Sequence, residues 1–371
     1  MPALRVEGLW KVFGRRPREV VDRLRNGADL AELRSSGATP AVIDVGFDVE
    51  PGEIFVVMGL SGSGKSTLLR MLNGLLEPTA GSVHVGDEEI TGLDARRLRD
   101  VRRRRISMVF QHFALLPHRS VLDNAAYALE VRGVERRTRH AAAREALAMV
   151  GLEGDAHRRP HQLSGGMQQR VGLARALASE ADVLLMDEAF SALDPLIRRE
   201  MQDQLIDLQR RLGRTIVFIT HDLNEAMRLG DRIAIMRDGR VVRLGTPEEI
   251  LADPGDEYVE RFLADVDRSR VLTAADVMTE VGTTGTAGAV RVPPTAPVAT
   301  LLDALGSSEP VVVVDDAGRP CGLVRPEAVL AALAGTPAPG PDGRPPAVLP
   351  GDAPGPAVNG SRVALAGGRR G

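Results

Sequence analysis

The chain has 371 residues, a formal net charge of −3 and a single cysteine, Cys321. The length allows two domains of ordinary size, the near-neutral charge gives no global attraction to nucleic acid, and one cysteine excludes an intrachain disulfide and favours a reducing compartment. The N-terminus lacks a secretory apolar stretch and no run approaches the roughly 18 apolar residues of a membrane helix, so we expect any membrane-spanning partner to be a separate polypeptide.

The composition changes along the chain and predicts three regions. Residues 1–265 alternate short apolar runs with helical patterns, which indicates one largely α/β domain. Residues 270–335 form a smaller unit with its own predicted strand at 310–314. Residues 336–371 are rich in Pro, Gly and Ala without periodicity, so we expect a disordered tail that is either functionally silent or carries a partner motif.

A glycine-rich loop follows the apolar run at 54–58. Residues 59–66 have the pattern G-x-x-x-x-G-K-S, which is typical of a phosphate-binding loop. Backbone N–H groups of such a loop surround phosphate oxygens, and the dipole of the following helix favours the negative charge. The candidate ATP-binding residues in this loop are Gly59, Ser61, Gly62, Gly64, Lys65, Ser66 and Thr67.

Two of these residues have predicted individual roles. Lys65 is expected to neutralise the β- and γ-phosphates, and Ser66 to place its hydroxyl on Mg²⁺. Lysine otherwise occurs only at Lys11, so a chain that uses arginine almost everywhere has a lysine in this loop. A compact ammonium fits between phosphates where a guanidinium would crowd them. The alternative is a chance lysine in a Gly/Ser turn.

An arginine-rich run at 96–105 precedes a predicted strand at 106–110. The run contains no aromatic residue, which favours a solvated helix face over contact with nucleic acid, with attraction to an anionic membrane surface as the alternative. Gln111 follows the strand directly. It is a candidate to reach Mg²⁺ and to respond to the γ-phosphate.

Two further strands are predicted to end at catalytic side chains. The continuous apolar run 183–186 indicates a buried parallel strand, and ligands of open α/β sheets bind at the carboxyl ends of such strands. Asp187 is expected to hold the metal through its water shell, and Glu188 to polarise the attacking water as general base. The alternative is that both carboxylates only cap the next turn. After the β-branched run 215–219, His221 is a candidate to bond the γ-phosphate and hold Glu188 in line.

Together with residues 163–170, which read LSGGMQQR, these motifs resemble the ATP-hydrolysing subunit of ABC transporters. The resemblance implies an α/β fold, a P-loop NTPase of ABC ATPase type with an inserted helical subdomain at about 111–175. In that family the LSGG segment contacts ATP held by a second subunit, so two chains enclose two ATP molecules. The residues implied for ATP contact in trans are Ser164, Gly165 and Gly166.

The same resemblance assigns two further positions. Asp194 lies in the segment 191–194, which resembles the intersubunit loop through which the paired sites communicate. Phe13 resembles the aromatic residue on which adenine stacks, and Trp10 is the alternative. Either aromatic side chain is also compatible with a place in the core.

A narrower resemblance is to the ATPases of glycine betaine/proline and related quaternary-amine importers. It rests on an insertion between Gly14 and Val42, with apolar residues at roughly helical spacing, and on the segments 58–67, 70–73 and 110–118. It implies ATP and Mg²⁺ as cofactors, a homodimer of ATPase subunits, a membrane permease, an extracytoplasmic substrate-binding protein acting indirectly, and no nucleic acid. The implied location is peripheral, on the cytoplasmic face of the inner membrane.

The segment 110–118 lies where the helical subdomain of these ATPases receives the permease. Its apolar residues Phe113, Leu115 and Leu116 are therefore candidates for an interface, with a place in the core as the alternative.

The smaller unit, residues 270–335, resembles a single CBS module of small α+β type. The resemblance rests on residues 276–279, 297–305, 310–316 and 318–324. Only one copy is recognisable, although such modules work as tandem pairs. Arg325 and Ala328 stand where the family has the hydroxyl and carboxylate that bind a nucleotide, which argues against ribose recognition and leaves Arg325 as a phosphate contact. The hypothesis is that this unit sets subunit contacts or senses ionic strength.

Other functions were weighed against the sequence. A soluble ABC ATPase acting on DNA or the ribosome is disfavoured because the chain has one cassette and no heptad arm. A regulator without turnover is disfavoured because every catalytic residue type is present. A different small cargo stays open, since the permease and the binding protein choose the cargo, and the direction of transport is implied by resemblance alone.

Overall fold

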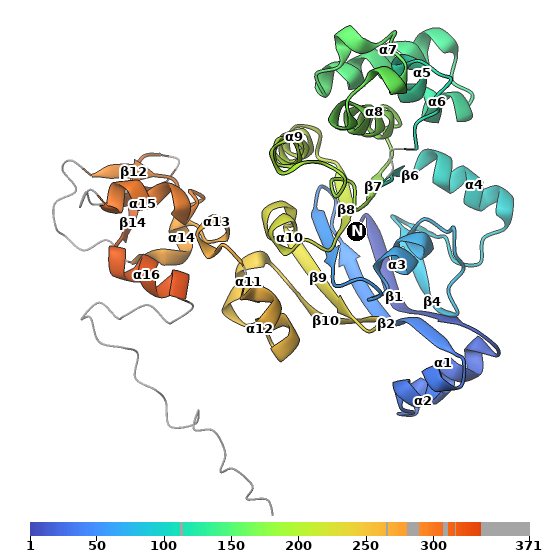
Figure 1. Cartoon of the computed structure of the whole chain (residues 1–371), viewed down its shortest axis with the longest axis horizontal. Helices are drawn as coiled ribbons and strands as arrows, with labels where there is room; N and C mark the ends of the chain where they lie inside the picture. The colour runs from blue at the N-terminus through green and yellow to red at the C-terminus, as the bar shows by residue number, and fades with distance from the viewer. Residues whose placement is uncertain (112–113, 265, 280–288, 307–310, 316, 335–371) are drawn as a thin grey trace, which may run out of the picture. The chain divides into compact units, whose positions relative to one another are not determined.

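The computed structural model describes residues 1–111, 114–264, 266–279, 289–306, 311–315 and 317–334 (Figure 1). The chain divides into two compact units, residues 1–271 and 272–371. Each unit has a hydrophobic core of its own. The predicted tail at 336–371 lies outside the described residues.

The N-terminal unit contains two β-sheets. The first is four-stranded and antiparallel, in the order β2-β1-β4-β5, formed by Thr39–Val49, Leu4–Phe13, Ala80–Val85 and Glu88–Glu89. The second is six-stranded, in the order β10-β9-β3-β8-β7-β6, formed by Arg240–Gly245, Arg232–Arg237, Ile54–Met58, Thr215–Thr220, Val183–Asp187 and Ile106–Val109. Strands β9, β3, β8, β7 and β6 run parallel, and β10 is antiparallel to β9.

The helices of this unit follow the strands in chain order. They are α1 Pro17–Arg25, α2 Leu30–Ser35, α3 Lys65–Leu72, α4 Ala95–Arg104, α5 Val121–Ala125, α6 Tyr127–Val131, α7 Arg136–Met149, α8 Gly165–Ala178, α9 Pro195–Leu212, α10 Leu223–Leu229, α11 Pro247–Ala252, α12 Glu257–Leu263 and α13 Arg268–Val271. Short 3₁₀ turns occupy Glu153–Asp155 and Pro160–Gln162. Helices α5 to α8 pack on one another and form a helical group apart from the two sheets (Figure 1).

The central strands of the parallel sheet are buried along their length. Every residue of β3 and β8 is buried, and so are the first four residues of β7. Parallel strands covered on both faces require such continuous apolar runs. The buried strands predicted at 183–186 and 215–219 are therefore confirmed. Their carboxyl ends, with that of β3, lie at one edge of the sheet.

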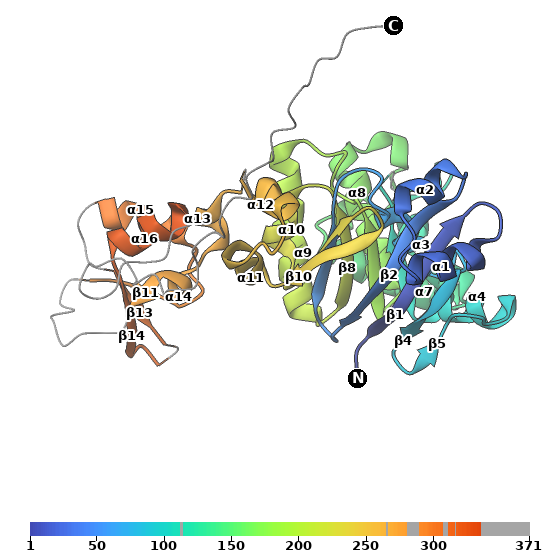
Figure 2. The same ribbon diagram turned by 90° about the horizontal axis from the view of Figure 1, so that it is seen from below.

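The insertion between β1 and β2 forms α1 and α2, which pack against these two strands (Figure 2). Its apolar residues meet the sheet in a separate cluster that consists of Trp10, Val12, Val20, Val21, Leu24, Leu33, Ala38 and Ile43. Trp10 is only 2% exposed there. The alternative assignment of Trp10 as the residue that stacks on adenine is therefore wrong, because the insertion covers its ring.

The arginine-rich run forms α4, in which Val101 is the buried residue. The Asp94 carboxylate caps this helix and accepts hydrogen bonds from the backbone N–H groups of Arg96 and Arg97, at 2.8 and 3.0 Å. The arginines thus lie on a solvated helix face, as the sequence predicted.

The C-terminal unit has a small four-stranded sheet in the order β11-β14-β13-β12. Its elements are α14 Ala274–Val277, β11 Met278–Thr279, β12 Val290–Val292, α15 Val298–Gly306, β13 Val311–Val314, β14 Pro320–Val324 and α16 Pro326–Ala334. Buried residues from α14, α15, α16, β13 and β14 form its core. Across the part of the chain that the structure describes, no helix combines the length and the apolar character needed to cross a bilayer.

Candidate active site

The phosphate loop connects β3 to α3 in a backbone conformation that depends on glycine. Gly59 and Gly64 have φ angles of 149° and 107°. A β-carbon at Gly59 would lie 2.2 Å from the carbonyl oxygen of Met236, and one at Gly64 would lie 2.3 Å from that of Ala41. Both distances are below any contact that real atoms make. The loop can therefore fold against the two neighbouring segments only when these positions lack a side chain.

The loop forms the floor of a hollow of about 480 Å³ at the carboxyl ends of the parallel strands. The residues that line it are Leu60, Ser61, Gly62, Gly64, Lys65, Ser66, Thr67, Glu188 and His221. The structure thus brings together three segments that are far apart in the sequence. Gly59 lies behind the hollow and supports the turn.

Lys65 begins α3 and is only 5% exposed. Its ammonium donates hydrogen bonds to the carbonyl oxygens of Gly59 and Leu60, at 2.7 and 3.0 Å. Burial lowers the pKa of Lys65, and the negative charges of Glu188 and Asp187 oppose that shift. A desolvated cation facing two carboxylates is suited to a site that takes up phosphate groups.

Asp187 is the last residue of β7. Burial, and then the neighbouring charge of Glu188, raises the pKa of the Asp187 carboxyl group. The positive charges of Arg70 and Lys65 compensate only in part. An oxygen-donor set with excess negative charge, made of this carboxylate and the Ser66 hydroxyl, fits a hard divalent cation such as Mg²⁺.

Glu188 and His221 form a contact pair across β7 and β8. His221 Nδ1 lies 3.1 Å from Glu188 Oε2. Glu188 has a φ angle of 44°, which is rare for a residue with a side chain. Its backbone N–H donates to the carbonyl oxygen of Ile219 at 2.9 Å, which holds the strained residue in place. Strain of this kind concentrates at functional sites.

Gln111 is exposed and does not line the hollow. Its Nε2 donates to Ser191 Oγ at 3.2 Å, and Ser191 Oγ in turn donates to the carbonyl oxygen of Glu188 at 2.9 Å. Gln111 is therefore connected to the Glu188 segment through one hydroxyl group. Sequence reasoning identified Gln111 but missed Ser191 as its partner.

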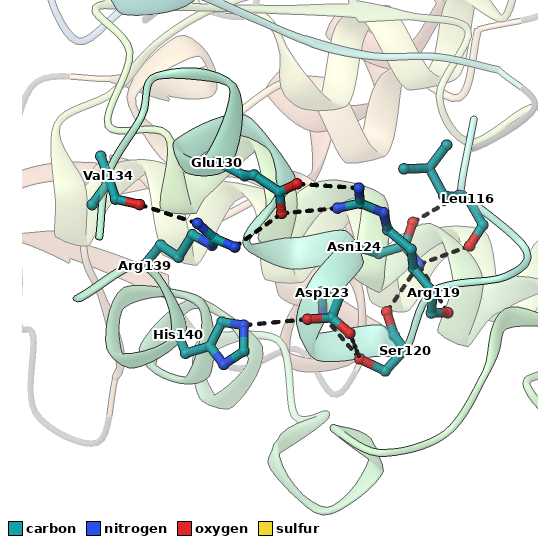
Figure 3. Close-up of polar contacts among 9 residues, drawn as sticks. All are labelled: Leu116, Arg119, Ser120, Asp123, Asn124, Glu130, Val134, Arg139 and His140. Carbon is teal, nitrogen blue, oxygen red and sulfur yellow. Dashed lines mark hydrogen bonds and ion pairs between the residues drawn. The ribbon is translucent and has the colours of Figure 1, made fainter. Parts of the chain in front are cut away.

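The segment that follows Gln111 is fixed to the helical group by Asn124, which is fully buried (Figure 3). The Asn124 side-chain oxygen accepts from the backbone N–H of Leu116 at 2.7 Å. Its amide donates to the carbonyl oxygens of Leu116, Arg119 and Ser120, at 3.1, 3.4 and 2.9 Å. No periodicity or motif marks this asparagine, so sequence reasoning missed it.

Two ion-pair groups surround this anchor (Figure 3). Arg119 makes a bidentate contact with Glu130, at 2.9 and 3.1 Å, and Arg139 approaches the same carboxylate at 3.2 Å. His140 Nε2 lies 3.2 Å from Asp123 Oδ1. These pairs connect the helix starts and loops of the helical group, which makes it one polar-braced body.

The remaining predicted residues lie away from the hollow. Phe13, at the end of β1, is 42% exposed. Ser164 caps α8 by accepting from the backbone N–H of Met167 at 3.3 Å, and Asp194 caps α9 by accepting from that of Ile197 at 3.1 Å. Ser164, Gly165 and Asp194 are exposed and Gly166 is half-buried. The structure does not bring these residues to the phosphate loop of the same chain.

The fold and the site have counterparts among known proteins. Residues 42–191 match the ABC transporter family. The glycine betaine transport ATP-binding protein OpuAA of Bacillus subtilis is 53% identical over 323 residues, which cover 86% of this chain and 76% of that protein. The chain therefore belongs to the ABC transporter ATPase family.

Its relatives narrow the assignment within that family. The glycine betaine/carnitine transport ATP-binding protein GbuA of Listeria monocytogenes is 56% identical over 279 residues, covering 75% of this chain and 70% of that protein. The chain thus falls in the branch of glycine betaine transport ATP-binding proteins.

A solved structure matches the fold as well. It is the dimeric structure of a post-hydrolysis state of the ATP-binding cassette MJ0796, bound to ADP and Pi. It has a TM-score of 0.55 and 33% identity, and it covers 66% of this chain and 98% of that cassette. The predicted family and the P-loop NTPase fold are confirmed, while the CBS-like assignment of the C-terminal unit stays a prediction.

Proposed function

We propose that this chain is the ATP-hydrolysing subunit that powers import of glycine betaine or a related quaternary amine through a separate membrane permease. The observation that carries this proposal is the more than 50% identity to glycine betaine transport ATP-binding proteins over most of the chain, in a protein whose phosphate loop, Glu188 and His221 line one hollow. The second candidate cargo is carnitine, which the name of the Listeria relative includes.

The hollow suggests how the residues divide the work. The phosphate loop binds the ATP phosphates, and Lys65 supplies a desolvated positive charge next to them. Glu188 accepts a proton from the attacking water, and His221 holds the Glu188 carboxylate in line through the 3.1 Å contact. Ser66, Asp187 and Gln111 would hold Mg²⁺, which when bound would neutralise charge on the phosphate oxygens.

A second copy would complete the site. Ser164, Gly165 and Gly166 begin α8 at the surface, where a helix N-terminus favours an anion. We infer that they contact ATP held by the partner subunit, that Asp194 lies at the subunit contact, and that the exposed ring of Phe13 stacks on adenine. The dimeric MJ0796 cassette supports a paired arrangement.

The permease has a candidate docking groove on the helical group. A hollow of about 550 Å³ is lined by apolar and aromatic side chains, among them Met108, Phe110 and Val131, and by arginines of α4. Phe110 and Val131 are 38% and 39% exposed. Leu115 and Leu116 are half-buried nearby in the chain, and Phe113 lies outside the described residues. In this proposal the chain is peripheral at the inner face of the membrane, and the substrate-binding protein acts through the permease.

The C-terminal unit is proposed to be a single CBS-like module that regulates the ATPase. Its four-stranded sheet and own core make it a separate small α+β unit. Its proposed role is to set subunit contacts or to sense ionic strength.

Replacement of Glu188 tests the catalytic part of the proposal. In the full transporter in liposomes, Glu188→Gln should bind ATP with unchanged affinity, while turnover falls by about 100-fold or more because the amide cannot accept the proton. The matched control is Glu145→Gln, an exposed position on α7, which should leave turnover unchanged. Normal turnover in Glu188→Gln would contradict the assignment of the general base.

The cargo is tested in the same liposomes with permease and binding protein present. Glycine betaine, proline betaine, choline, carnitine and proline are added in turn, and ATP hydrolysis is measured. Stimulation by a betaine, choline or carnitine is expected. Basal hydrolysis without stimulation by any of these compounds would retain the ATPase and overturn the quaternary-amine cargo.

A further inference from the structure

Arg198 connects two loops that meet at the candidate active site. It lies in the first turn of α9, and its Nη2 donates to the carbonyl oxygens of Ser191 and Leu193, at 3.3 and 3.2 Å. Its Nη1 donates to Asp222 Oδ2 at 3.3 Å. Ser191 and Leu193 belong to the loop that ends at Asp194, and Asp222 directly follows His221.

These contacts close a ring around the catalytic pair. Ser191 is bonded to Glu188 through the hydroxyl contact of 2.9 Å and through its backbone N–H at 3.1 Å. His221 contacts Glu188 at 3.1 Å. The ring therefore runs from Glu188 through Ser191, Arg198, Asp222 and His221 back to Glu188. Because the ring is closed, the loop 191–194 cannot shift without changing the position of His221 relative to Glu188.

The two ends of the Arg198 contact differ in stiffness. Asp222 is fixed because its Oδ1 also caps α10, accepting from the backbone N–H of Glu225 at 3.1 Å. The loop 191–194 is held mainly by its own turn and by the guanidinium. A planar guanidinium can bond two carbonyl groups and a carboxylate together, which a lysine ammonium on a flexible stem cannot reproduce. A displacement of the loop is thus passed to Asp222 rather than absorbed.

We propose that Arg198 is a positioning residue that couples the loop 191–194 to the Glu188–His221 pair of the same chain. The proposal rests on the proposed roles of Glu188, His221 and Asp194. When a second copy contacts Asp194, Arg198 carries the loop position through Asp222 to His221. Glu188 is then held in line only in the closed pair, so hydrolysis depends on subunit contact.

The first test uses the full chain with its permease in liposomes. Arg198→Met should leave the dissociation constant of ATP within about twofold and lower kcat about tenfold, which corresponds to about 1.4 kcal/mol. Arg198→Lys should lower kcat similarly, because it retains a charge near Asp222 but not the bonds to the loop. The matched control is Arg199→Met, exposed at the next position of α9. Asp222→Asn, which keeps the cap of α10, should reproduce Arg198→Met and serves if that variant does not fold.

A double-mutant cycle then separates coupling from stability. In an Asp194→Ala background, Arg198→Met should lower kcat by less than about twofold further, because the signal has already been lost. A further tenfold loss would overturn the proposal, and so would a loss of kcat that only matches the fraction unfolded by thermal melting. If Glu188→Gln retains turnover, the proposed function fails instead, whatever Arg198 does. The expected result is a kcat effect of Arg198 that vanishes when Asp194 is absent.

Discussion

Gly64 and Gly62 lie two positions apart in the phosphate loop and have very different surroundings. Both have positive φ angles, 107° and 82°. A β-carbon at Gly64 would overlap the backbone of Ala41, whereas at Gly62 nothing lies within 4 Å. The same substitution at the two positions therefore distinguishes strain in φ alone from a collision with backbone.

Gly64→Ala should lower the free energy of unfolding by more than about 3 kcal/mol, since the β-carbon forces the loop away from β2. Gly62→Ala should cost only about 1–2 kcal/mol, the price of a left-handed alanine. Urea unfolding without nucleotide measures both. Equal losses would contradict the packing described here.

Glu225 is a buried acid whose effect on stability depends on pH. It is 5% exposed, and its Oε1 accepts from Gln202 Nε2 at 3.0 Å. Burial raises the pKa of Glu225, and hydrogen bonds from Thr220 and Gln202 oppose the shift only in part. The unfolded chain loses this proton first as pH rises, so folding stability falls from about pH 4.3 upward through the raised pKa.

Glu225→Gln should remove that loss because an amide has no proton to release. We expect the variant to be more stable than the parent chain by about 1 kcal/mol or more at pH 8, with the gain shrinking toward pH 4. Denaturant unfolding at several pH values measures the difference. Glu145→Gln is the exposed control, and a gain that is constant with pH would contradict the assignment to Glu225.

The sequence allowed prediction of those residues whose neighbours in the chain define a pattern. The loop from Gly59 to Thr67 is contiguous, and Asp187 and Glu188 follow a recognisable buried strand. Arg198 and Asn124 escaped because their partners are carbonyl groups, which no residue type reveals. Ser191 escaped for a related reason, since its bond to Gln111 joins positions 80 residues apart.

Among the elements, the helical group depends on one side chain that belongs to no apolar pattern. Asn124 satisfies one N–H and three carbonyl groups of the segment that follows Gln111. Buried backbone groups that lose their partner cost about 1–3 kcal/mol each. The connection between the strand β6 and helices α5 to α8 therefore depends on an amide.

Asn124→Ala should destabilise the chain by about 2–4 kcal/mol and speed amide hydrogen exchange at Leu116 and along α5. Asn224→Ala, at an exposed position of α10, should change stability by less than about 0.5 kcal/mol. Exchange rates that are unchanged around Leu116 in Asn124→Ala would disprove the anchoring role.

Elements were predictable where a single period dominates, and less so where packing decides. The buried parallel strands and the arginine-bearing α4 follow from runs of one residue character. Trp10 could not be placed from sequence, because its burial depends on α1 and α2 folding back over β1. The same tryptophan on an uncovered strand would be available to a ligand.

For the whole molecule, the ATP hollow is confined to the N-terminal unit. All residues that line it lie within 1–271, and this unit has its own core. Folding and ATP binding should therefore not require the C-terminal unit, whose core is formed by residues after 271.

A chain lacking residues 272–371 should fold and bind ATP with a dissociation constant within about twofold of the full chain, because no contact to the hollow is lost. If the C-terminal unit senses ionic strength, the salt dependence of transport in liposomes should disappear in this deletion. An unchanged salt dependence would exclude sensing, and an aggregated chain would exclude independent folding.

Cys321 gives this chain a practical property. It is the one cysteine of the sequence, it is exposed on β14, and its Sγ donates to the carbonyl oxygen of Val313 at 3.4 Å. A thiol-reactive spin label or fluorophore would therefore attach once per copy without any substitution. In a pair of copies the two labels would occupy equivalent positions, so the spacing between C-terminal units can be followed by dipolar or energy-transfer spectroscopy while ATP and salt are varied.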